Sequence, residues 1–533
     1  MDDAFPDRSI QACLQFAGIT PEQVDVVSYA WHDHFPYEEH LVDYVSRAID
    51  IASEGPDAKR IMLERIKVEV ERSVPRKLDF VKRMEDMGWA KKVEYFDHHE
   101  GHAASAFYPS PFDEALVVTL DASGNFRSGS ISIGKGTELK EISCNYTWDS
   151  LGFLYGQITE YLGFKPHRHE GKVTGLAAYG DPQKCLPLMQ KMIQVRDGKI
   201  VSLMGEGYYK PFFYEQSEKL KVALKSFSRE DIAAGLQKHF EDVVTQYIQY
   251  YVEETGVGNL ALAGGVFANV KLNQRIRAIP GVKDIYVFPH MGDGGLSVGG
   301  CLLSLAARGI RPSPWQQVYL GNESNDADVR AVFEKYKDQI AVETLNQEEV
   351  AKRAVELLQK NTVIGLFQGR MEYGPRALGN RSIIYHANDK TVNDWLNKRM
   401  HRTEFMPFAP FTTMELAPRC FVGWQPSHVT TRFMTECYDC TDEMKQNSPA
   451  VVHVDGTARP QIIAREDNPL YYDIVDGWHK ETGGLCLINT SFNEHEHPIV
   501  CTIEDAVTSL LGDNVDCVLV NGKYFVKRIA ISV

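Results

Sequence analysis

Short apolar runs that end at glycine-rich turns alternate with longer amphipathic stretches along this 533-residue chain. The apolar runs predict strands, which we place at 24–31, 92–96, 115–120, 127–133, 260–263, 285–288, 363–367 and 485–488. Spacing of three and four between apolar residues predicts helices, which we place at 5–17, 41–83, 146–162, 231–254 and 348–360. Strands that alternate with helices are typical of α/β folds.

The predicted helix 231–254 has the clearest apolar stripe. Ile232, Leu236, Phe240, Val243 and Ile248 recur at helical spacing and would lie on one side. A stripe of this kind is typical of packing against a sheet, so we interpret this helix as core and not as a cofactor site.

Two histidines stand where a predicted strand meets the next helix. His98 and His102 are four residues apart and would share one helical face, from which two imidazoles can bind one divalent metal ion. The zincin pattern His-Glu-x-x-His is not met, because position 103 is Ala. The alternative is a pair of structural histidines at a helix start.

Two carboxylates are candidates to complete that site. Asp121 ends the strand-like run 115–120, and Asp293 follows the run 285–288 within a glycine turn. In α/β folds, side chains at the ends of strands commonly form the functional site. The metal hypothesis therefore uses His98, His102, Asp121 and Asp293.

Glycine clusters at two strand ends predict a nucleotide side to the site. Glycine lets a ligand approach the backbone closely, and a following helix N-terminus favours negative charge. The candidates for this role are Gly264, Gly265, Asn269, Gly294 and Gly295, together with Lys172 between Gly171 and Gly175. A solvated loop remains the alternative for the region around Lys172.

Arginines gather beside glycines and prolines in the last third of the chain. Planar guanidinium groups bind phosphate through paired hydrogen bonds, so converging arginines favour a phosphate or acyl-phosphate site. The candidates are Arg370, Arg376, Arg381, Arg402 and Arg459, with Asn489, Ser491 and Asn493 as polar donors after the strand 485–488. Because these arginines are confined to one half, we expect that half alone to bind the phosphate-containing ligands.

Composition narrows the choice of partners. The formal net charge of −15 argues against a nucleic-acid binder, which would present a basic face. No apolar run reaches the roughly 18 residues needed to cross a bilayer, and the acidic start is unlike a secretory signal. Among the scattered cysteines only Cys437 and Cys440 form a close pair, and no second pair completes a zinc site, so we expect reduced thiols, with a structural zinc at that pair as the alternative. We therefore expect a cytoplasmic protein without a membrane partner.

Several motifs resemble those of the NodU-type O-carbamoyltransferases. They are Asp97-His98-His99-x-x-His102, Glu170-Gly171-Lys172-x-x-Gly175, Gly264-Gly265-Val266-Phe267-x-Asn269, Gly369 to Ile383, Asp455 to Gln461 and Asn489 to Asn493. In that family a β-hairpin with a Gly-Ile-Ser-type loop and a His-Asp pair precedes the first helix, and here it has no counterpart. We expect either that it lies upstream or that this is a divergent form.

The resemblance implies two domains. Residues 1–335 would form a TsaD-like, actin-type (ASKHA) ATPase fold for carbamoyl transfer, without its N-terminal hairpin. Residues 345–533 would form an α+β YrdC-like domain for carbamoyl-adenylate formation.

It also implies a two-step reaction. In the C-terminal domain, carbamoyl phosphate and ATP would give carbamoyl-adenylate and pyrophosphate, with Arg376, Arg402, Arg459 and Ser491 as catalytic residues. In the N-terminal domain, the carbamoyl group would pass to a hydroxyl of a small natural product. Two imidazoles and two carboxylates suit Fe²⁺ or a similar ion; a further Mg²⁺ and a homodimer are left open.

Two other functions fit parts of the chain. A TsaD-type enzyme that makes threonylcarbamoyl-tRNA would need a basic RNA-binding face, which the acidic balance disfavours. An inactive nucleotide-binding regulator would agree with the absent hairpin. Turnover of ATP and carbamoyl phosphate separates these alternatives from a carbamoyltransferase.

Overall fold

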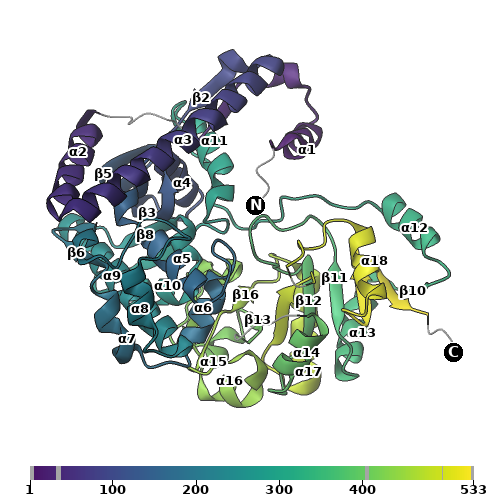
Figure 1. Cartoon of the computed structure of the whole chain (residues 1–533). Helices are drawn as coiled ribbons and strands as arrows, with labels where there is room; N and C mark the ends of the chain where they lie inside the picture. The colour runs from purple at the N-terminus through teal and green to yellow at the C-terminus, as the bar shows by residue number, and fades with distance from the viewer. Residues whose placement is uncertain (1–4, 32–37, 402–406, 495, 530–533) are drawn as a thin grey trace.

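The computed structural model describes residues 5–31, 38–401, 407–494 and 496–529, which form a mixed α/β structure around two large sheets (Figure 1). No helix within these ranges is long and apolar enough to cross a membrane. The α/β class predicted from the alternation of apolar runs and amphipathic stretches is confirmed.

The first sheet has five strands in the order β5-β4-β3-β8-β9. β3 pairs antiparallel with β4 and parallel with β8, so it stands at the centre. The strands are β3 (Glu114–Gly124), β4 (Arg127–Lys135), β5 (Glu138–Tyr146), β8 (Asn259–Ala263) and β9 (Asp284–Val287). They include the strands predicted at 115–120, 127–133 and 260–263, and they place the carboxyl ends of β3, β8 and β9 at one edge.

Helices cover both faces of this sheet because successive residues of β3 are apolar and point to opposite faces. Leu116 and Val118 pack in the core formed with α5 and α9, whereas Ala115 and Val117 pack against α4. The helices of this half are α1 (Asp7–Ala17), α2 (Glu38–Ser53), α3 (Pro56–Asp86), α4 (His98–Phe107), α5 (Leu151–Tyr161), α6 (Glu170–Ala177), α7 (Pro182–Met189), α8 (Glu218–Leu224), α9 (Arg229–Thr255), α10 (Val270–Arg277) and α11 (Leu296–Ala306).

The strand expected at 24–31 is shorter and less buried than its sequence indicated. β1 (Val27–Tyr29) pairs only with β2 (Val93–Tyr95) among the described residues, and its three residues are half-buried. The helix predicted before it is confirmed as α1, which ends at Gly18 in the left-handed conformation. A hairpin, β6 (Ile193–Arg196) with β7 (Lys199–Ser202), completes the strands of this half.

The second sheet has eight strands in the order β10-β19-β18-β11-β12-β17-β13-β16. These are β10 (Ile340–Thr344), β11 (Ile364–Phe367), β12 (Arg381–His386), β13 (Ala409–Thr413), β16 (Gln461–Ile463), β17 (Leu487–Ser491), β18 (Cys517–Val520) and β19 (Tyr524–Arg528). A short antiparallel pair, β14 (Tyr438–Asp439) with β15 (Thr457–Ala458), lies apart from it.

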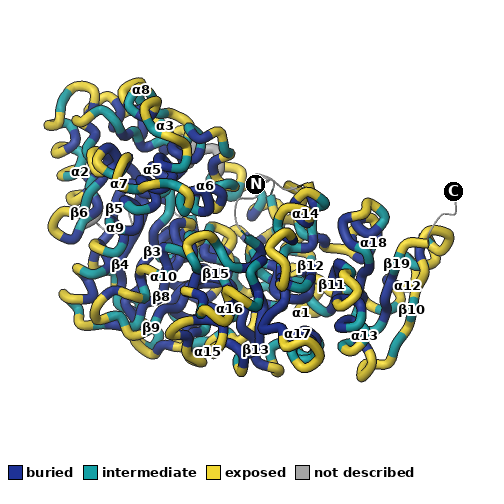
Figure 2. Tube along the Cα trace, turned by 90° about the horizontal axis from the view of Figure 1, so that it is seen from below, coloured by how far each residue is buried: buried dark blue, intermediate teal, exposed yellow. Residues whose placement is uncertain are grey.

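The helices of the second half pack around this sheet, and the most deeply buried segments in Figure 2 follow the central strands of both sheets. They are α12 (Asp326–Lys335), α13 (Gln347–Gln359), α14 (Val392–Arg399), α15 (Ala417–Cys420), α16 (Asp442–Asn447), α17 (Pro469–Thr482) and α18 (Ile503–Leu511). We call residues up to α11 the N-terminal half and residues from α12 the C-terminal half.

The two halves are joined by buried polar contacts along α10. Arg277 donates to both carboxylate oxygens of Glu436, at 2.6 and 2.8 Å, and Glu436 is fully buried. The amide of Cys437 donates to the carbonyl of Val270 at 3.1 Å, and the Asn273 side chain donates to the carbonyl of Thr435. Breaking such a contact would leave a buried charge unpaired, so the halves are held in one arrangement.

Replacing Gly264 tests how closely β3 and β8 approach at the site edge. Gly264 has φ +102°, and a Cβ there would lie 2.1 Å from the carbonyl oxygen of Leu120. We expect Gly264→Ala to lower the free energy of unfolding by about 3 kcal/mol or more, because strain and a clash add. Gly256→Ala is the matched control: its φ is +70° with no atom near the added Cβ. Equal losses in urea unfolding would contradict the close approach.

Candidate functional site

The first turn of α4 is fixed by its own capping residues. Asp97 accepts hydrogen bonds from the amides of His99 and Glu100, at 2.8 and 3.3 Å, and the Glu100 side chain accepts from the Asp97 amide. Such a reciprocal cap satisfies the free amides at a helix start. Arg127, which is fully buried, donates to Asp97 at 2.9 Å. The position of His98 at the start of α4 therefore follows from the local sequence.

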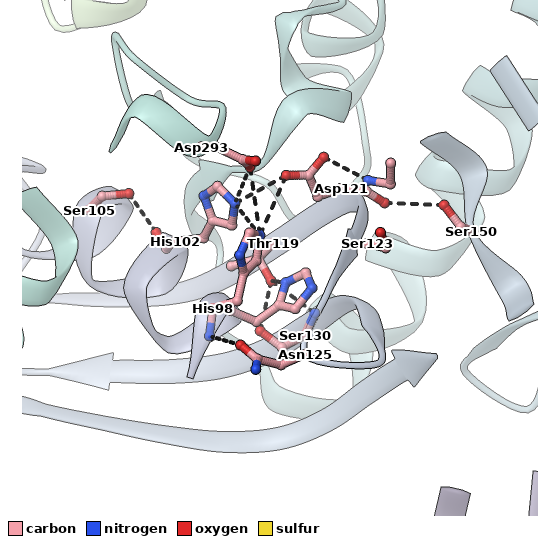
Figure 3. A network of polar contacts seen from close by, with 12 residues as sticks. His98, His102, Ser105, Thr119, Asp121, Ser123, Asn125, Ser130, Ser150 and Asp293 are labelled. Atoms are coloured by element: carbon pink, nitrogen blue, oxygen red, sulfur yellow. Dashed lines mark hydrogen bonds and ion pairs between the residues drawn. The ribbon is translucent and has the colours of Figure 1, made fainter. Parts of the chain in front are cut away.

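His98, His102, Asp121 and Asp293 converge, as predicted from the sequence (Figure 3). The two Nε2 atoms lie 3.1 Å apart, and both histidines are fully buried. Asp121 Oδ2 lies 3.1 Å from Nε2 of His102 and 3.7 Å from that of His98. Asp293 Oδ1 lies 3.6 and 3.7 Å from the same two nitrogens. Four atoms that can bind metal thus face one point from α4, β3 and the turn after β9.

These distances match the edges of a metal coordination shell. Ligands about 2.1 Å from a tetrahedrally coordinated ion lie ~3.4 Å from one another, and the atoms of this cluster all lie within 4.8 Å of one another. Two imidazole nitrogens at 3.1 Å otherwise need a proton between them. The donor set of two nitrogens and two carboxylate oxygens fits a borderline divalent ion such as Fe²⁺.

In the cluster, the carboxylates favour the protonated form of His102, and the histidines favour the ionised form of Asp121. Burial lowers the pKa of His102, but hydrogen bonds from its ring to Asp121 and Asp293 more than offset this and raise that pKa to about 9. Burial raises the pKa of Asp121, and its bonds to His102 and His98 reverse the effect and hold the pKa well below its usual value. The site therefore keeps a carboxylate charge that attracts a cation.

Close packing by small residues makes room for the cluster. A Cβ on Gly124 would lie 2.2 Å from the ring of His98, and one on Gly265 would lie 3.1 Å from Asp121 Oδ1. Asn125, in the left-handed turn after β3, accepts a hydrogen bond from the His98 amide at 3.0 Å. Sequence reasoning missed Gly124 and Asn125, although their place between two predicted strands marks a tight hairpin.

The remaining glycine candidates shape the same edge. Gly294 and Gly295 lie in the one-turn helix that carries Asp293, and a Cβ on Gly294 would meet the His290 ring at 2.0 Å. Asn269 has a different position: it caps α10 and exchanges two hydrogen bonds with Gln237. Lys172 lies nearly buried on α6. Their roles toward a nucleotide stay predictions.

A pair of like charges marks a second candidate site. The charges of Arg376 and Arg459 interact with each other, and burial together with the Arg459 charge lowers the pKa of Arg376. Arginine stays protonated in proteins, so two such groups side by side carry an electrostatic cost. A bound anion between them would offset that cost, as a phosphate group does.

The loop that carries Arg376 is held from several sides. Glu372 accepts hydrogen bonds from the amides of Leu378, Asn380 and Arg381, at 2.7, 2.8 and 3.2 Å. Asn489, fully buried on β17, donates to the carbonyl of Ala377 at 3.0 Å. The sequence prediction included Asn489 as a polar donor but missed Glu372, whose place inside the glycine-arginine motif was the available signal.

The other arginines direct their donors to the protein itself. Arg381 is fully buried, donates to four backbone carbonyls and lies over the Phe367 ring at 3.9 Å. Arg370 donates to the carbonyls of Gly321 and Leu320. Arg402 lies outside the described residues. Arg376 and Arg459 are therefore the described candidates whose charges act on each other.

The polar residues after β17 form a compact loop. The hydroxyl of Ser491 donates to the side chain of Asn493, and Asn493 donates to the carbonyls of Glu494 and His497. Ser491 and Asn489 both belong to β17, which pairs with β12. Ser491 lies opposite Ser382, the residue after Arg381. The structure thus brings Asn489 beside the Arg376 loop and keeps Ser491 and Asn493 at the end of the same strand.

A cavity of about 210 Å³ lies between the two halves. Its walls come from α6, α9 and α10 in the N-terminal half and from segments 407–409 and 451–459 in the C-terminal half, and Arg459 lines it. We call it the interface cavity. The prediction that α9 is core is confirmed for Ile232, Leu236 and Phe240, which are buried. The face of α9 that lines this cavity was not identified from the sequence.

Comparison with known proteins gives two family models that match the chain. The model described as carbamoyltransferase N-terminus matches residues 1–302, and the one described as carbamoyltransferase C-terminus matches residues 355–528. Nodulation protein NolNO of Sinorhizobium fredii is 33% identical over 531 residues, covering 98% of this chain and 74% of that protein. Nodulation protein NolO of Bradyrhizobium diazoefficiens is 32% identical, covering 81% of this chain and 79% of that protein.

Among solved structures, the crystal structure of T. kodakarensis HypF matches with a TM-score of 0.32 and 13% identity, covering 57% of this chain and 43% of that chain. A likeness at this level carries no argument about fold or function.

Metal analysis tests the His–Asp cluster. We expect the purified protein to contain a divalent metal, and the double variant His98→Ala/His102→Ala to lose it, because two of four ligands are removed. Elemental analysis after dialysis measures the metal, and circular dichroism confirms that each protein is folded. His479→Ala, on α17, is the control that should retain the metal. Equal metal in the double variant would contradict the site.

Stability measurements distinguish Arg376 from Arg381. We expect Arg381→Met to lower the free energy of unfolding by about 3 kcal/mol or more, because four carbonyls lose a charged donor. Arg376→Met should preserve or raise stability, because it removes a like-charge contact. Phosphate should raise the melting temperature of the wild type more than that of Arg376→Met. An equal response of both proteins to phosphate would place the anion site elsewhere.

Proposed function

We propose a function on the premise that this chain belongs to the carbamoyltransferase family, whose two family models match most of it. Membership supports carbamoyl transfer. The finer proposal is an ATP-dependent O-carbamoyltransferase that makes carbamoyl-adenylate and transfers the carbamoyl group to a hydroxyl of a small natural product. Nodulation proteins are among its relatives.

One observation carries this proposal: the two candidate sites have different chemistry and lie in different halves. The His–Asp cluster offers nitrogen and carboxylate ligands at the end of β3. Arg376 and Arg459 offer positive charge in the C-terminal half. Adenylation develops negative charge on phosphates, and carbamoyl transfer develops it on a carbonyl oxygen, so each step needs its own stabilising groups.

The arrangement of strands supports the proposed domains. The order β5-β4-β3-β8-β9 places three antiparallel strands beside three parallel ones that share β3, an arrangement compatible with an actin-type ATPase fold in residues 1–335. For residues 345–533 we propose the YrdC-like domain. β10, which immediately precedes them, pairs with β19 in the second sheet.

In the first proposed step, Arg376 and Arg459 bind the phosphates. Atom balance requires that carbamoyl phosphate loses its phosphate to water, and that the resulting carbamate oxygen attacks the α-phosphorus of ATP. The bond from the α-phosphorus to the bridging oxygen breaks, and pyrophosphate leaves with the electron pair. Two guanidinium groups beside this point would stabilise the charge that accumulates on the phosphate oxygens.

In the second proposed step, the acceptor hydroxyl attacks the carbamoyl carbon and releases its proton to solvent. The bond from that carbon to the phosphate oxygen breaks, and AMP leaves with the electron pair. His98, His102, Asp121 and Asp293 would hold a divalent ion, which supplies Lewis-acid polarisation of a bound oxygen. Asn125 holds the backbone amide of His98, Gly124 leaves space for its ring, and the glycines around Asp121 and Asp293 let a nucleotide approach the backbone. Both histidines are buried, whereas Asp293 is exposed, so the cluster is open to a ligand from the side of Asp293.

Damage to each site should block a different step. We expect His102→Ala to release pyrophosphate from ATP and carbamoyl phosphate without forming carbamoylated product, because the arginines are intact. Arg459→Ala should release no pyrophosphate, and added carbamoyl-adenylate should restore its product. Pyrophosphate release and product mass are measured with a panel of hydroxylated natural products as acceptors.

The exposed ion pair of Arg465 with Asp473 provides the control, since Arg465→Ala removes a surface charge of the same half. Equal thermal stability of the variants excludes a general folding defect. A folded His102→Ala protein that releases no pyrophosphate, together with an Arg459→Ala protein that carbamoyl-adenylate does not restore, would show that the two steps share one site.

A further inference from the structure

The interface cavity is built by both halves, although the anion-binding candidates belong to one. Arg459 lines it from the C-terminal half, and Arg376 lies beside Arg459. At the rim, Lys271 of α10 and Asp455 form an ion pair between the halves at 2.9 Å. A ligand in this cavity therefore contacts the N-terminal half and Arg459 at the same time.

One face of α9 lines the cavity with residues at helical spacing. Ala234, Gln237 and Glu241 follow at intervals of three and four and so lie on one side of the helix. Ala177 and Ala178 face the same space from α6. Three alanines leave room where larger side chains would fill it.

Glu241 is the carboxylate of this wall. It is 8% exposed, and one of its oxygens accepts a hydrogen bond from Gln237 at 2.8 Å. Its other oxygen lies 3.8 Å from Nε of Arg275, which is too long for a hydrogen bond, and accepts none from the described residues. Burial raises the pKa of Glu241. A ligand N–H group would satisfy this oxygen.

Gln237 is fixed and so holds Glu241 in place. Its amide exchanges two hydrogen bonds with Asn269, at 2.9 and 3.1 Å, and it accepts from the Tyr155 hydroxyl at 2.8 Å. Because its side-chain amide is occupied by Asn269, Tyr155 and Glu241, Gln237 serves as a positioning residue for Glu241. The predicted nucleotide-side residue Asn269 thus supports the cavity wall from behind.

The space suits a nucleotide base. An apolar cavity of roughly 150 Å³ accepts a benzene ring, so about 210 Å³ has room for a bicyclic base. Val270 and Val451 add apolar walls, and Phe408 adds an aromatic one. The ligand this combination fits has a flat apolar body, an N–H donor for Glu241 and a phosphate group for Arg459.

We propose that the interface cavity binds the base of ATP and that Glu241 accepts a hydrogen bond from its exocyclic amino group. The inference rests on the proposed adenylation step and adds the residue that selects the nucleotide. A carboxylate that accepts from an amino group repels a carbonyl oxygen at the same position, so adenine is favoured over hypoxanthine. The arginines in the sequence predict that the C-terminal half binds its phosphate-containing ligands by itself. Under this proposal that half alone lacks Glu241 and the other α9 residues that contact the base.

Comparison of ATP with inosine triphosphate tests the proposal, because the base of the latter has a carbonyl where adenine has its amino group. With the full-length protein and carbamoyl phosphate, we expect kcat/KM for pyrophosphate release to be at least roughly tenfold higher with ATP. Glu241→Gln should bring the ratio close to one, because its amide can donate to the carbonyl. Glu254→Gln, exposed on the same helix, should keep the wild-type ratio.

A Glu241→Gln protein with the wild-type ratio would overturn the assignment. Ala234→Leu provides a second variant that fills the cavity and keeps every charge. It should weaken ATP binding at least tenfold in calorimetry, at an unchanged or higher melting temperature, and unchanged affinity would also overturn the proposal. If the wild type releases no pyrophosphate from either nucleotide, the proposed function fails. Calorimetry then tests separately whether the interface cavity binds the base. A higher affinity for ATP than for inosine triphosphate that Glu241→Gln removes would support the assignment, and equal affinities or no binding would refute it.

Discussion

The approach of α4 to the end of β3 is the contact on which the N-terminal site depends. It brings two imidazole nitrogens, which lie 3.1 Å apart on α4, within 3.7 Å of two carboxylates. Such crowding is stable only if opposite charges offset each other and no bulky side chain intervenes. Glycine therefore occupies positions 124, 264 and 265, where a Cβ would meet the His98 ring, the Leu120 carbonyl or the Asp121 carboxylate.

The two sites are mechanically connected, although they belong to different sheets. The Tyr373 hydroxyl donates to the carbonyl of Gly294 at 2.6 Å. Tyr373 is three residues before Arg376, and Gly294 directly follows Asp293. A Cβ on Gly374, which has φ +123°, would lie 3.0 Å from the carbonyl of Pro289. The loop that positions one arginine thus rests on the turn that positions one metal-ligand candidate. A displacement of either loop would disturb both sites.

Much of the fold could be predicted from the sequence because it follows from local patterns. The apolar runs gave β3, β4, β8 and β11, and the spacing of four gave the shared face of His98 and His102. Convergence of Asp121 and Asp293 on that face was predicted because parallel strands end at one sheet edge. The partners of Arg381 could not be predicted: four backbone carbonyls that surround a buried guanidinium have no signature in sequence.

The interface cavity escaped sequence reasoning for a related reason. A helix that packs on a sheet through one stripe leaves its other faces undetermined, and on α9 the face of Gln237 and Glu241 meets a segment some two hundred residues later in the chain. Only the seating of the halves, through Arg277 with Glu436 and Lys271 with Asp455, turns that face into a wall. Because Arg459 belongs to the C-terminal half and Glu241 to α9, a ligand that contacts both gains full binding energy only when the halves are correctly seated. If the cavity binds a nucleotide as proposed, that binding and the arrangement of the two sites would be coupled by geometry, without any need for a separate moving element.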